Sequence, residues 1–171
     1  MVVNTRIFGE IDIEESKIIT FEKGIIGMPD FKKFTLIYDS DKKDSNIRWL
    51  QSLDDGTMAL PVVDPLIVLD KYEPLVNAEL MERLGEYEAT RDLMILVTLR
   101  VPSDLREMTI NLKGPIIINT ANNRAVQIIV DDDYPVRFPI IETAKKSNLK
   151  YITPPYTEHT CCFLPISWFK R

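Results

Sequence analysis

The chain has few of the side chains on which catalysis and metal binding most often depend. Among its 171 residues there is one histidine, His159, and there are two cysteines, Cys161 and Cys162, which are adjacent. A lone histidine in a polar, Pro-rich segment is more often solvated than a general base. Adjacent cysteines match no zinc motif and are poorly placed for a disulfide with each other. No G-x-S-x-G nucleophile elbow occurs. We therefore expect neither an enzyme, nor a cofactor, nor a metal site.

Long apolar runs are also missing. No stretch of about 18 apolar residues exists, so the sequence predicts no membrane-spanning helix. The first residues, MVVNTRIFGEID, are too polar for a signal peptide. Hydrophobic residues at 45% and charged residues at 27% are ordinary for a soluble globular protein, and the length suits one domain. These features favour a cytoplasmic protein without membrane contact.

The charge is unevenly distributed along the chain. Residues 145–171 contain five Lys and Arg against Glu158 alone, which gives +4. Because the whole chain carries −5, residues 1–144 carry −9. An acidic body is repelled by phosphate, so direct nucleic-acid binding is disfavoured and a basic protein partner is better suited.

A β-hairpin is the strongest local prediction. Asp55-Gly56 lies between two apolar runs within residues 47–65, and this dipeptide is typical of a two-residue turn with positive φ at both positions. Pro61 cannot donate a ladder hydrogen bond, which predicts an edge or bulged strand. The turn predicts three cross-strand pairs: Leu53 with Met58, Gln51 with Leu60, and Trp49 with Val62.

Most of the remaining pattern also predicts strands. Residues 2–38 read as short extended pieces with a turn at Gly24–Gly27, and 66–69 reads as a further short strand. One helix is expected at about 77–85, with Asn77 as its N-cap and Gly85 as its stop. Residues 93–101 predict a central strand, and Asn122-Asn123 predicts a second hairpin turn. The fold class is therefore mostly β: a single small antiparallel β-barrel-like domain over 1–140, followed by a basic tail, 141–171, that contains prolines and aromatic residues and has no assigned role.

Two acidic segments are candidates for partner binding. The first, within DPLIVLDKYEPLVN, offers Asp64, Asp70, Tyr72 and Glu73, groups that a surface rich in Lys and Arg could contact. The alternative for this segment is that Tyr72 covers the barrel end and the acids are solvated. The second segment is Asp131, Asp132 and Asp133, whose spacing is not that of an EF-hand loop.

Several phrases together resemble the FliW family of flagellar assembly factors. They occur in order over about residues 1–140: Thr5 with Phe8-Gly9, ITFEKGIIG at 19–27, Leu50-Gln51-Ser52, Asp64-Pro65, Tyr72-Glu73, TINLKGPIIIN at 109–119, Gln127, and Asp133-Tyr134-Pro135. Met28 stands where the family usually has Phe, and the tail after about residue 141 has no counterpart.

The resemblance implies a partner switch rather than catalysis. FliW proteins bind CsrA, the carbon storage regulator, and prevent this RNA-binding repressor from silencing flagellin messenger RNA. They also bind newly made flagellin, which displaces CsrA. The resemblance further implies a small β-barrel-like fold. Two alternatives remain: a small β-barrel enzyme, for which the sequence offers no convergent polar residues, and an OB-like nucleic-acid-binding barrel, which would need surface aromatics among Lys and Arg.

Overall fold

The computed structural model describes residues 1–38 and 46–140; His159, Cys161, Cys162 and the predicted tail lie outside the described residues. The described part contains one short α-helix, four 3-10 turns and eleven strands. The strands are β1 Val2–Thr5, β2 Gly9–Asp12, β3 Ile19–Phe21, β4 Lys33–Tyr38, β5 Arg48–Ser52, β6 Ala59–Val63, β7 Leu93–Arg100, β8 Thr109–Ile110, β9 Ile116–Asn119, β10 Arg124–Gln127 and β11 Phe138–Pro139. The helix is α1 Ala78–Glu82, and the turns are η1 Glu15–Lys17, η2 Pro65–Ile67, η3 Thr90–Asp92 and η4 Leu105–Glu107.

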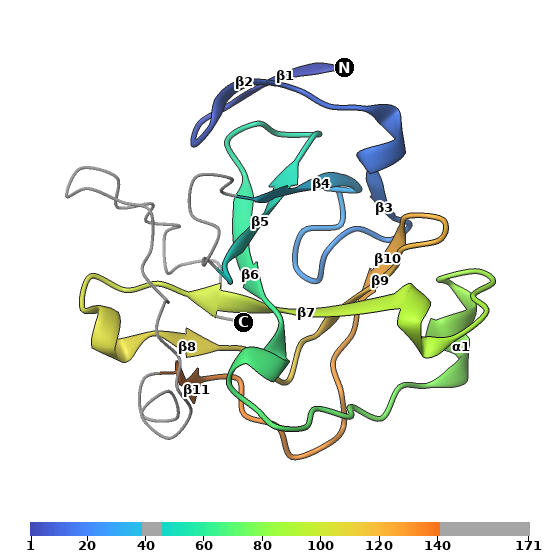
Figure 1. Cartoon of the computed structure of the whole chain (residues 1–171), viewed down its shortest axis with the longest axis vertical. Helices are drawn as coiled ribbons and strands as arrows, with labels where there is room; N and C mark the ends of the chain where they lie inside the picture. Colours follow the sequence, from blue (N-terminus) through green and yellow to red (C-terminus); the bar gives the residue numbers. More distant parts are fainter. Residues whose placement is uncertain (39–45, 141–171) are drawn as a thin grey trace.

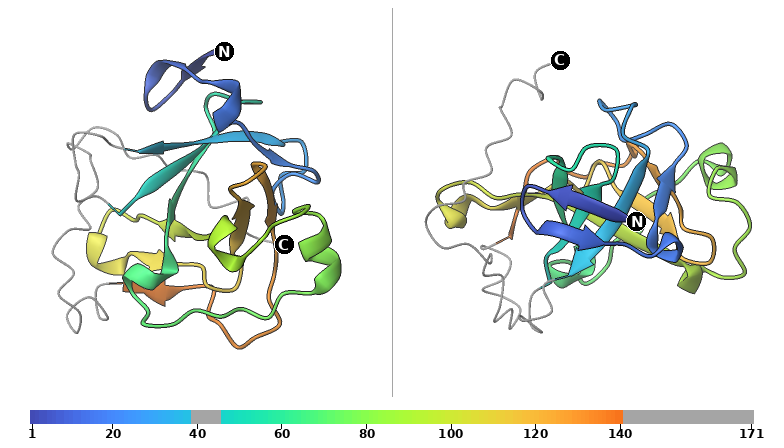
Figure 2. Two further views of the ribbon diagram at one scale, coloured as in Figure 1. Left: turned by 45° about the vertical axis from the view of Figure 1, so that its right-hand side comes forward. Right: turned by 90° about the horizontal axis from the view of Figure 1, so that it is seen from above.

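Seven of these strands close into a barrel (Figure 1). Their order is β7, β6, β5, β4, β3, β10 and β9, and β9 pairs back with β7. The mostly β, barrel-like prediction with one short helix is confirmed. One detail differs, because β3 and β10 run parallel whereas the other pairs are antiparallel. Strands β8 and β11 extend from β7 at one end of the barrel, and the β1–β2 ribbon lies across the opposite end (Figures 1 and 2).

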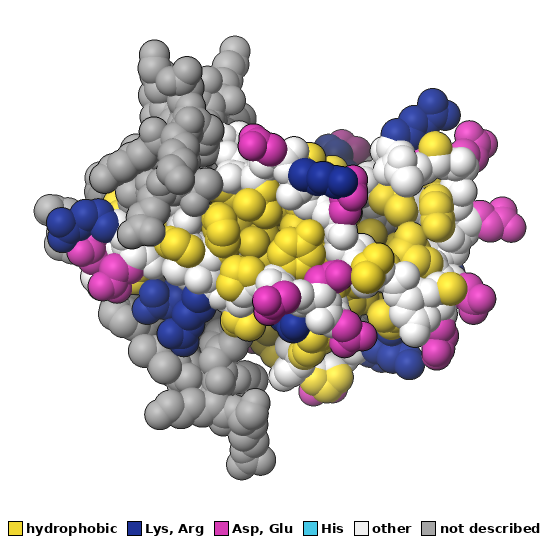
Figure 3. Space-filling view, turned by 90° about the horizontal axis from the view of Figure 1, so that it is seen from below, with side chains coloured by type: hydrophobic (Ala, Val, Ile, Leu, Met, Phe, Trp, Pro, Cys, Tyr) yellow, Lys and Arg dark blue, Asp and Glu magenta, His cyan; other side chains and the backbone are white. Residues whose placement is uncertain are grey.

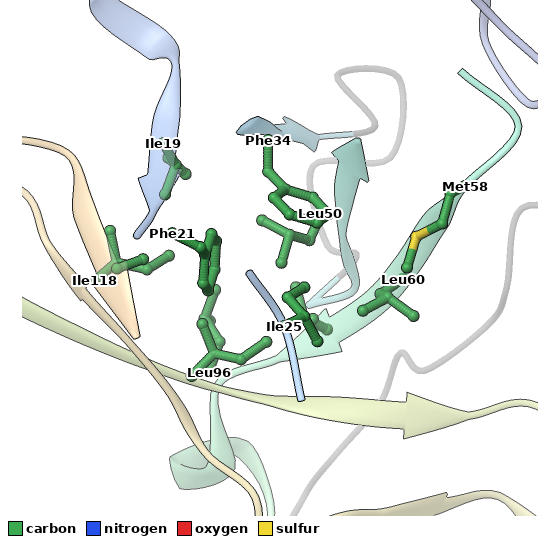
Figure 4. Packing of buried hydrophobic residues seen from close by; sticks show 12 residues of the cluster. Ile19, Phe21, Ile25, Phe34, Leu50, Met58, Leu60, Leu96 and Ile118 are labelled. Atoms are coloured by element: carbon green, nitrogen blue, oxygen red, sulfur yellow. The ribbon is translucent and has the colours of Figure 1, made fainter. Parts of the chain in front are cut away.

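Three apolar clusters hold this arrangement together. The first fills the barrel interior, where Phe21 meets Phe34 edge to face with ring centroids 5.1 Å apart (Figure 4). The second lies between β7, β8 and the segment that follows β6, and includes Tyr72 and Ile140. The third lies beneath α1 and is centred on Leu84. Together they bury both faces of much of the sheet, as expected for a barrel covered from outside.

The β5–β6 hairpin exists, but its predicted register is wrong by one residue. The observed pairs are Arg48 with Val62, Trp49 with Pro61, Leu50 with Leu60, and Gln51 with Ala59. A one-residue slip in pairing moves the side chains of one strand to the other face relative to its partner, here those of β5 relative to β6. Leu50 and Leu60 therefore point into the barrel, whereas Trp49 lies outside, with its ring 6.1 Å from that of Phe8.

The physical reason is a longer loop than Asp55-Gly56 alone suggests. The Ser52 amide donates to the Met58 carbonyl at 2.9 Å, so five residues rather than two connect the strands. The buried Gln51 Nε2 donates to the carbonyls of Ser52, Gly56 and Met58 at 3.0–3.2 Å and closes the loop from inside. Gly56 does not have positive φ. It is required there because a Cβ would collide with the Asn4 carbonyl oxygen of β1.

Pro61 does not mark an edge strand, because β6 lies between β5 and β7. The β6–β7 ladder includes Val62 and Val63 but not Pro61. Since Ser52 and Met58 form a hydrogen-bonded pair, alternation places Pro61 in a non-bonded pair with Trp49. The missing N–H therefore costs no ladder bond on either side.

Other local signals are mostly confirmed. Gly24 and Gly27 have φ of +67° and +83° at the predicted turn. Asn77 caps α1 by accepting the Glu79 amide at 2.8 Å, although the helix is shorter than predicted. Asn123 has φ of 56° in the β9–β10 turn. The strand predicted at 66–69 is wrong: η2 occupies this position, and the Asp64 carboxylate caps it by accepting the Leu66 amide at 2.8 Å.

Candidate partner-binding surface

The two predicted acidic segments, treated as alternatives from the sequence, form one continuous surface. The Leu75 amide donates to Asp132 Oδ2 at 2.7 Å, and the Glu73 amide donates to the Tyr134 hydroxyl at 3.4 Å. These contacts join positions 57 and 61 residues apart in the chain. We call the surface made by residues 64–75 and 131–136 the acidic end. It lies at the end of the barrel opposite the β1–β2 ribbon (Figure 1).

Tyr72 supports this surface from below. Its side chain is only 6% exposed, and its hydroxyl donates to the Leu112 carbonyl at 2.6 Å. Its ring lies 4.8 Å from that of Tyr134. Burial, followed by the nearby charges of Tyr134 and Asp132, raises the pKa of Tyr72 well above its usual value. A partner would therefore meet the neighbouring carboxylates before the Tyr72 ring.

The carboxylates of the acidic end differ in how far they are engaged. Asp64 is committed to capping η2. Glu73 lies 2.7 Å from the Lys71 ammonium, but both side chains are about 70% exposed, so water weakens the pair. Asp70, Asp131 and Asp133 are exposed and have no ion pair among the described residues. These three are the ones free to meet a cationic partner.

A single lysine braces the second acidic segment. The Lys113 Nζ donates to the Asp132 carbonyl at 2.8 Å, so its ammonium contacts the backbone of the acidic run. The Asp132 carboxylate is occupied by Leu75. Over the described ranges, no three His, Cys, Asp or Glu side chains lie close enough together to hold a metal ion.

Exposed apolar side chains lie among these acids. Leu66, Leu75 and Val136 are 57%, 76% and 58% exposed. Figure 3 looks onto the molecule from this end and shows hydrophobic side chains gathered on the face, with acidic side chains at their border. Sequence reasoning missed these apolar residues and Tyr134. The adjacency of Asp133-Tyr134-Pro135 to the acidic run was the available signal for Tyr134.

The surface combines single negative charges with apolar contact area. Exposed apolar side chains bordered by charge are typical of protein-binding surfaces. In the described ranges, no helix is long and apolar enough to cross a membrane.

Comparison with known proteins identifies the family. The FliW family model, described as "FliW protein", matches residues 2–140. The chain belongs to the FliW family. It is 46% identical over 150 residues to the flagellar assembly factor FliW of Lachnospira eligens, a match that covers 86% of this chain and 99% of that protein. The FliW of Lachnoclostridium phytofermentans is also 46% identical, over 144 residues, with 83% and 92% covered.

A solved FliW structure has the same fold. The crystal structure of the flagellar assembly factor FliW superposes with a TM-score of 0.75 at 26% identity, covering 82% of this chain and 96% of that one. The resemblance noted from the sequence is therefore confirmed, and so is the barrel. In all three matches nearly the whole relative is covered, while part of this FliW chain has no counterpart.

Proposed function

We propose that this FliW chain is a cytoplasmic, non-enzymatic flagellar assembly factor that binds CsrA and flagellin in competition. Bound to CsrA, it would prevent the repressor from silencing flagellin messenger RNA. Bound to flagellin, it would release CsrA, so that flagellin synthesis follows flagellin demand. Membership of the FliW family supports this role. The exposed carboxylates and apolar side chains of the acidic end support placing the binding surface there.

The charge of the acidic end suits an RNA-binding repressor. A protein that binds phosphate presents Lys and Arg, and complementary charge accelerates encounter and selects the partner. Asp70, Asp131 and Asp133 project into solvent without ion pairs among the described residues. The same carboxylates oppose direct binding of nucleic acid, which weighs against the OB-like alternative.

The apolar part of the surface suits flagellin. Amphipathic terminal helices dock by laying an apolar face against exposed apolar side chains. Leu66, Leu75 and Val136, which belong to the residues of the acidic end, provide such contact area. Because charged and apolar groups are interspersed, CsrA and flagellin would cover overlapping area, and this overlap is a physical basis for competition.

Titration calorimetry with purified CsrA and purified flagellin tests the proposal. We expect each to bind alone and flagellin to displace CsrA from a preformed complex. Absence of binding to both proteins at tens of micromolar would overturn the proposed function. Binding of both proteins without displacement would overturn the proposal that CsrA and flagellin use the same surface.

Charge reversal tests the assignment of the surface. Asp70→Lys with Glu73→Lys should weaken CsrA binding at least tenfold, about 1.4 kcal/mol, with the melting temperature nearly unchanged because both side chains are exposed. The matched control is Glu82→Lys with Glu86→Lys, which makes the same change of charge on two exposed residues at the helix side of the barrel. Equal weakening by both pairs would indicate a nonspecific effect of net charge, and full binding by the first pair would place the CsrA surface elsewhere.

The association rates of the two partners should depend differently on salt concentration. Association with CsrA should slow steeply as the Debye length falls from about 30 to 8 Å, because charge steers that encounter. Flagellin association should change less, since it depends more on apolar area. Stopped-flow rates over the salt series measure this, and equal salt sensitivity would contradict two chemically distinct modes of binding.

A further inference from the structure

Among residues 1–38 and 46–140, strand β4 has an edge that is paired over only part of its length, although the barrel is otherwise closed. On one side it pairs with β5 along Phe34–Tyr38. On the other side it pairs with β3 only at Lys33 and Phe34. Before Ile19 the chain turns into η1, where the amides of Lys17 and Ile18 donate to carbonyls within the same turn. The chain preceding β3 therefore leaves the outer half of β4 uncovered on that edge.

The direction of the backbone groups follows from the hydrogen-bond alternation. The Phe21 amide donates to the Lys32 carbonyl, so Phe34 and every second residue after it face the β3 side. The Leu53 amide donates to the Lys33 carbonyl, which assigns the odd-numbered residues of β4 to β5. Leu36 and Tyr38 consequently direct N–H and C=O toward the open edge, and neither makes a backbone hydrogen bond there within the described residues.

A shallow groove of about 260 Å³ runs along this edge. The residues 35–38 of β4 form one wall, and Ile11, Ile13 and Lys17 contribute to the other. The groove therefore offers main-chain donors and acceptors in line with apolar side chains. An extended peptide can satisfy both, whereas a helix uses its own backbone groups internally and would leave the β4 edge unpaired.

Acidic side chains border the groove. Asp12 lines it and pairs with the N-terminal ammonium at 3.1 Å, Glu14 is the N-cap of η1, and Glu15 is the first residue of η1. Lys17 is paired with Glu14 at 3.3 Å, and Glu15 has no ion pair among the described residues. Residues 10–17 carry four acidic side chains, which against Lys17 and the N-terminal ammonium leave a net charge of −2. The Arg48 guanidinium, 5.4 Å from the centre of the Tyr38 ring, offsets one of these charges. The remaining negative charge favours a basic occupant over an acidic one. It disfavours a second copy of this chain, because two chains that each carry a net charge of −5 repel each other.

We propose that the open edge of β4 binds an extended, basic segment of a protein partner by β-strand addition. The segment pairs with Leu36 and Tyr38 through main-chain hydrogen bonds, places apolar side chains against Ile11 and Ile13, and brings Lys or Arg near Asp12 and Glu15. The inference does not depend on the proposed function, since the groove lies at the ribbon end of the barrel, away from the acidic end (Figures 1 and 2).

Hydrogen exchange on the full-length protein gives the first test. In the free protein the amides of Leu36 and Tyr38 should exchange at least tenfold faster than those of Thr35 and Ile37, which bond to β5. The probe is the acetylated, amidated octapeptide Lys-Thr-Val-Thr-Val-Thr-Val-Lys. Saturation with it should slow both exposed amides at least tenfold. Slow exchange of these two amides before peptide is added would overturn the proposal. Protection that grows with protein concentration would also overturn it, because a second copy of the chain would then be covering the edge. So would absence of peptide binding at millimolar concentration.

Removing single donors gives the second test. Tyr38→Pro deletes the outward N–H but no bond to β5, and the matched variant Tyr38→Ala removes the ring while keeping the N–H. Strand addition predicts peptide binding at least fivefold weaker for Tyr38→Pro than for Tyr38→Ala. N-methylation of either the valines or the threonines of the peptide repeats the test without changing the protein. Only one of the two methylated peptides should lose binding; loss by both or by neither would overturn the proposal.

Discussion

Gly56 provides a direct test of how the β5–β6 loop is built. Had the loop been a two-residue turn, Gly56→Ala would cost about 1–2 kcal/mol for a left-handed backbone and nothing else would change. In the structure φ is not positive, so the backbone itself tolerates alanine. The cost comes instead from the Asn4 carbonyl oxygen, which a Cβ would strike, so β1 must move away.

The magnitude follows from what that movement disrupts. The Arg6 amide donates to the Gly56 carbonyl at 3.0 Å, a bond worth roughly 0.5–1.5 kcal/mol. Overpacking adds about 1–3 kcal/mol. We therefore expect Gly56→Ala to lower the free energy of unfolding by about 2–4 kcal/mol. The displaced ribbon should also uncover Trp49, which contacts Phe8 of the ribbon and is almost fully buried.

Urea unfolding with tryptophan fluorescence measures both effects. A Trp168→Phe background leaves Trp49 as the single emitter, because the chain has two tryptophans. Gly27→Ala is the control: φ is +83° with open space around the position, so about 1–2 kcal/mol is expected without a change in emission. A Gly56→Ala protein within about 0.5 kcal/mol of the parent, with unchanged Trp49 emission, would refute this account.

The remaining predictions concern buried polar groups. Tyr72→Phe leaves the Leu112 carbonyl unpaired and should cost about 1–3 kcal/mol in urea unfolding. Burial raises the pKa of Tyr72 in the folded state, so its contribution to stability is complete below the unfolded pKa and is lost as pH rises through the folded pKa. Absorbance at alkaline pH should therefore show a late-ionising tyrosine that is missing from Tyr72→Phe. Asn119 Nδ2 donates to the carbonyls of Leu84 and Glu86 at 3.0 and 2.9 Å, so Asn119→Asp would bury a charge against two acceptors. It should destabilise the protein by several kcal/mol at pH 7, less at acid pH where the carboxyl is protonated, and an unfolding free energy independent of pH would contradict this.

The features that short-range chemistry determines were predictable from the sequence. Gly24 and Gly27 mark a turn because their φ values are ones that few other residues adopt, and Asn77 caps a helix through its own side chain. The hairpin register was not predictable in this way. Trp49, Leu50, Gln51 and Ser52 are all buried, so alternation of polarity could not choose between the two faces. The choice depends on Gln51, which bonds across its own loop, and on the long-range approach of β1 to Gly56; neither is visible as an alternation of polarity.

The candidate surface was likewise predictable from the sequence only in part. Each acidic segment was visible as a run of carboxylates, and their order in the chain gave no reason to join them. The two segments are joined by the hydrogen bond from the Leu75 amide to Asp132 and by the contact between the tilted rings of Tyr72 and Tyr134, which only the folded barrel brings together. A tyrosine beside two acids is, on sequence grounds, equally a contact residue or a support. In the structure its ring is almost fully buried and its hydroxyl donates to the Leu112 carbonyl, so the side chain contributes to the packing of the barrel end.

This division of roles makes binding and stability separable at the acidic end. The groups that hold the surface in place, Tyr72 and the Asp132 carboxylate, are engaged in hydrogen bonds. The groups that project from it, Asp70 and Asp133, have no ion pair among the described residues and are exposed. Substitution of a projecting carboxylate should therefore change affinity with little change in the melt, while substitution of a supporting group should change both. A partner that instead lost affinity only with the supporting groups would be recognising the shape of the barrel end rather than its charge.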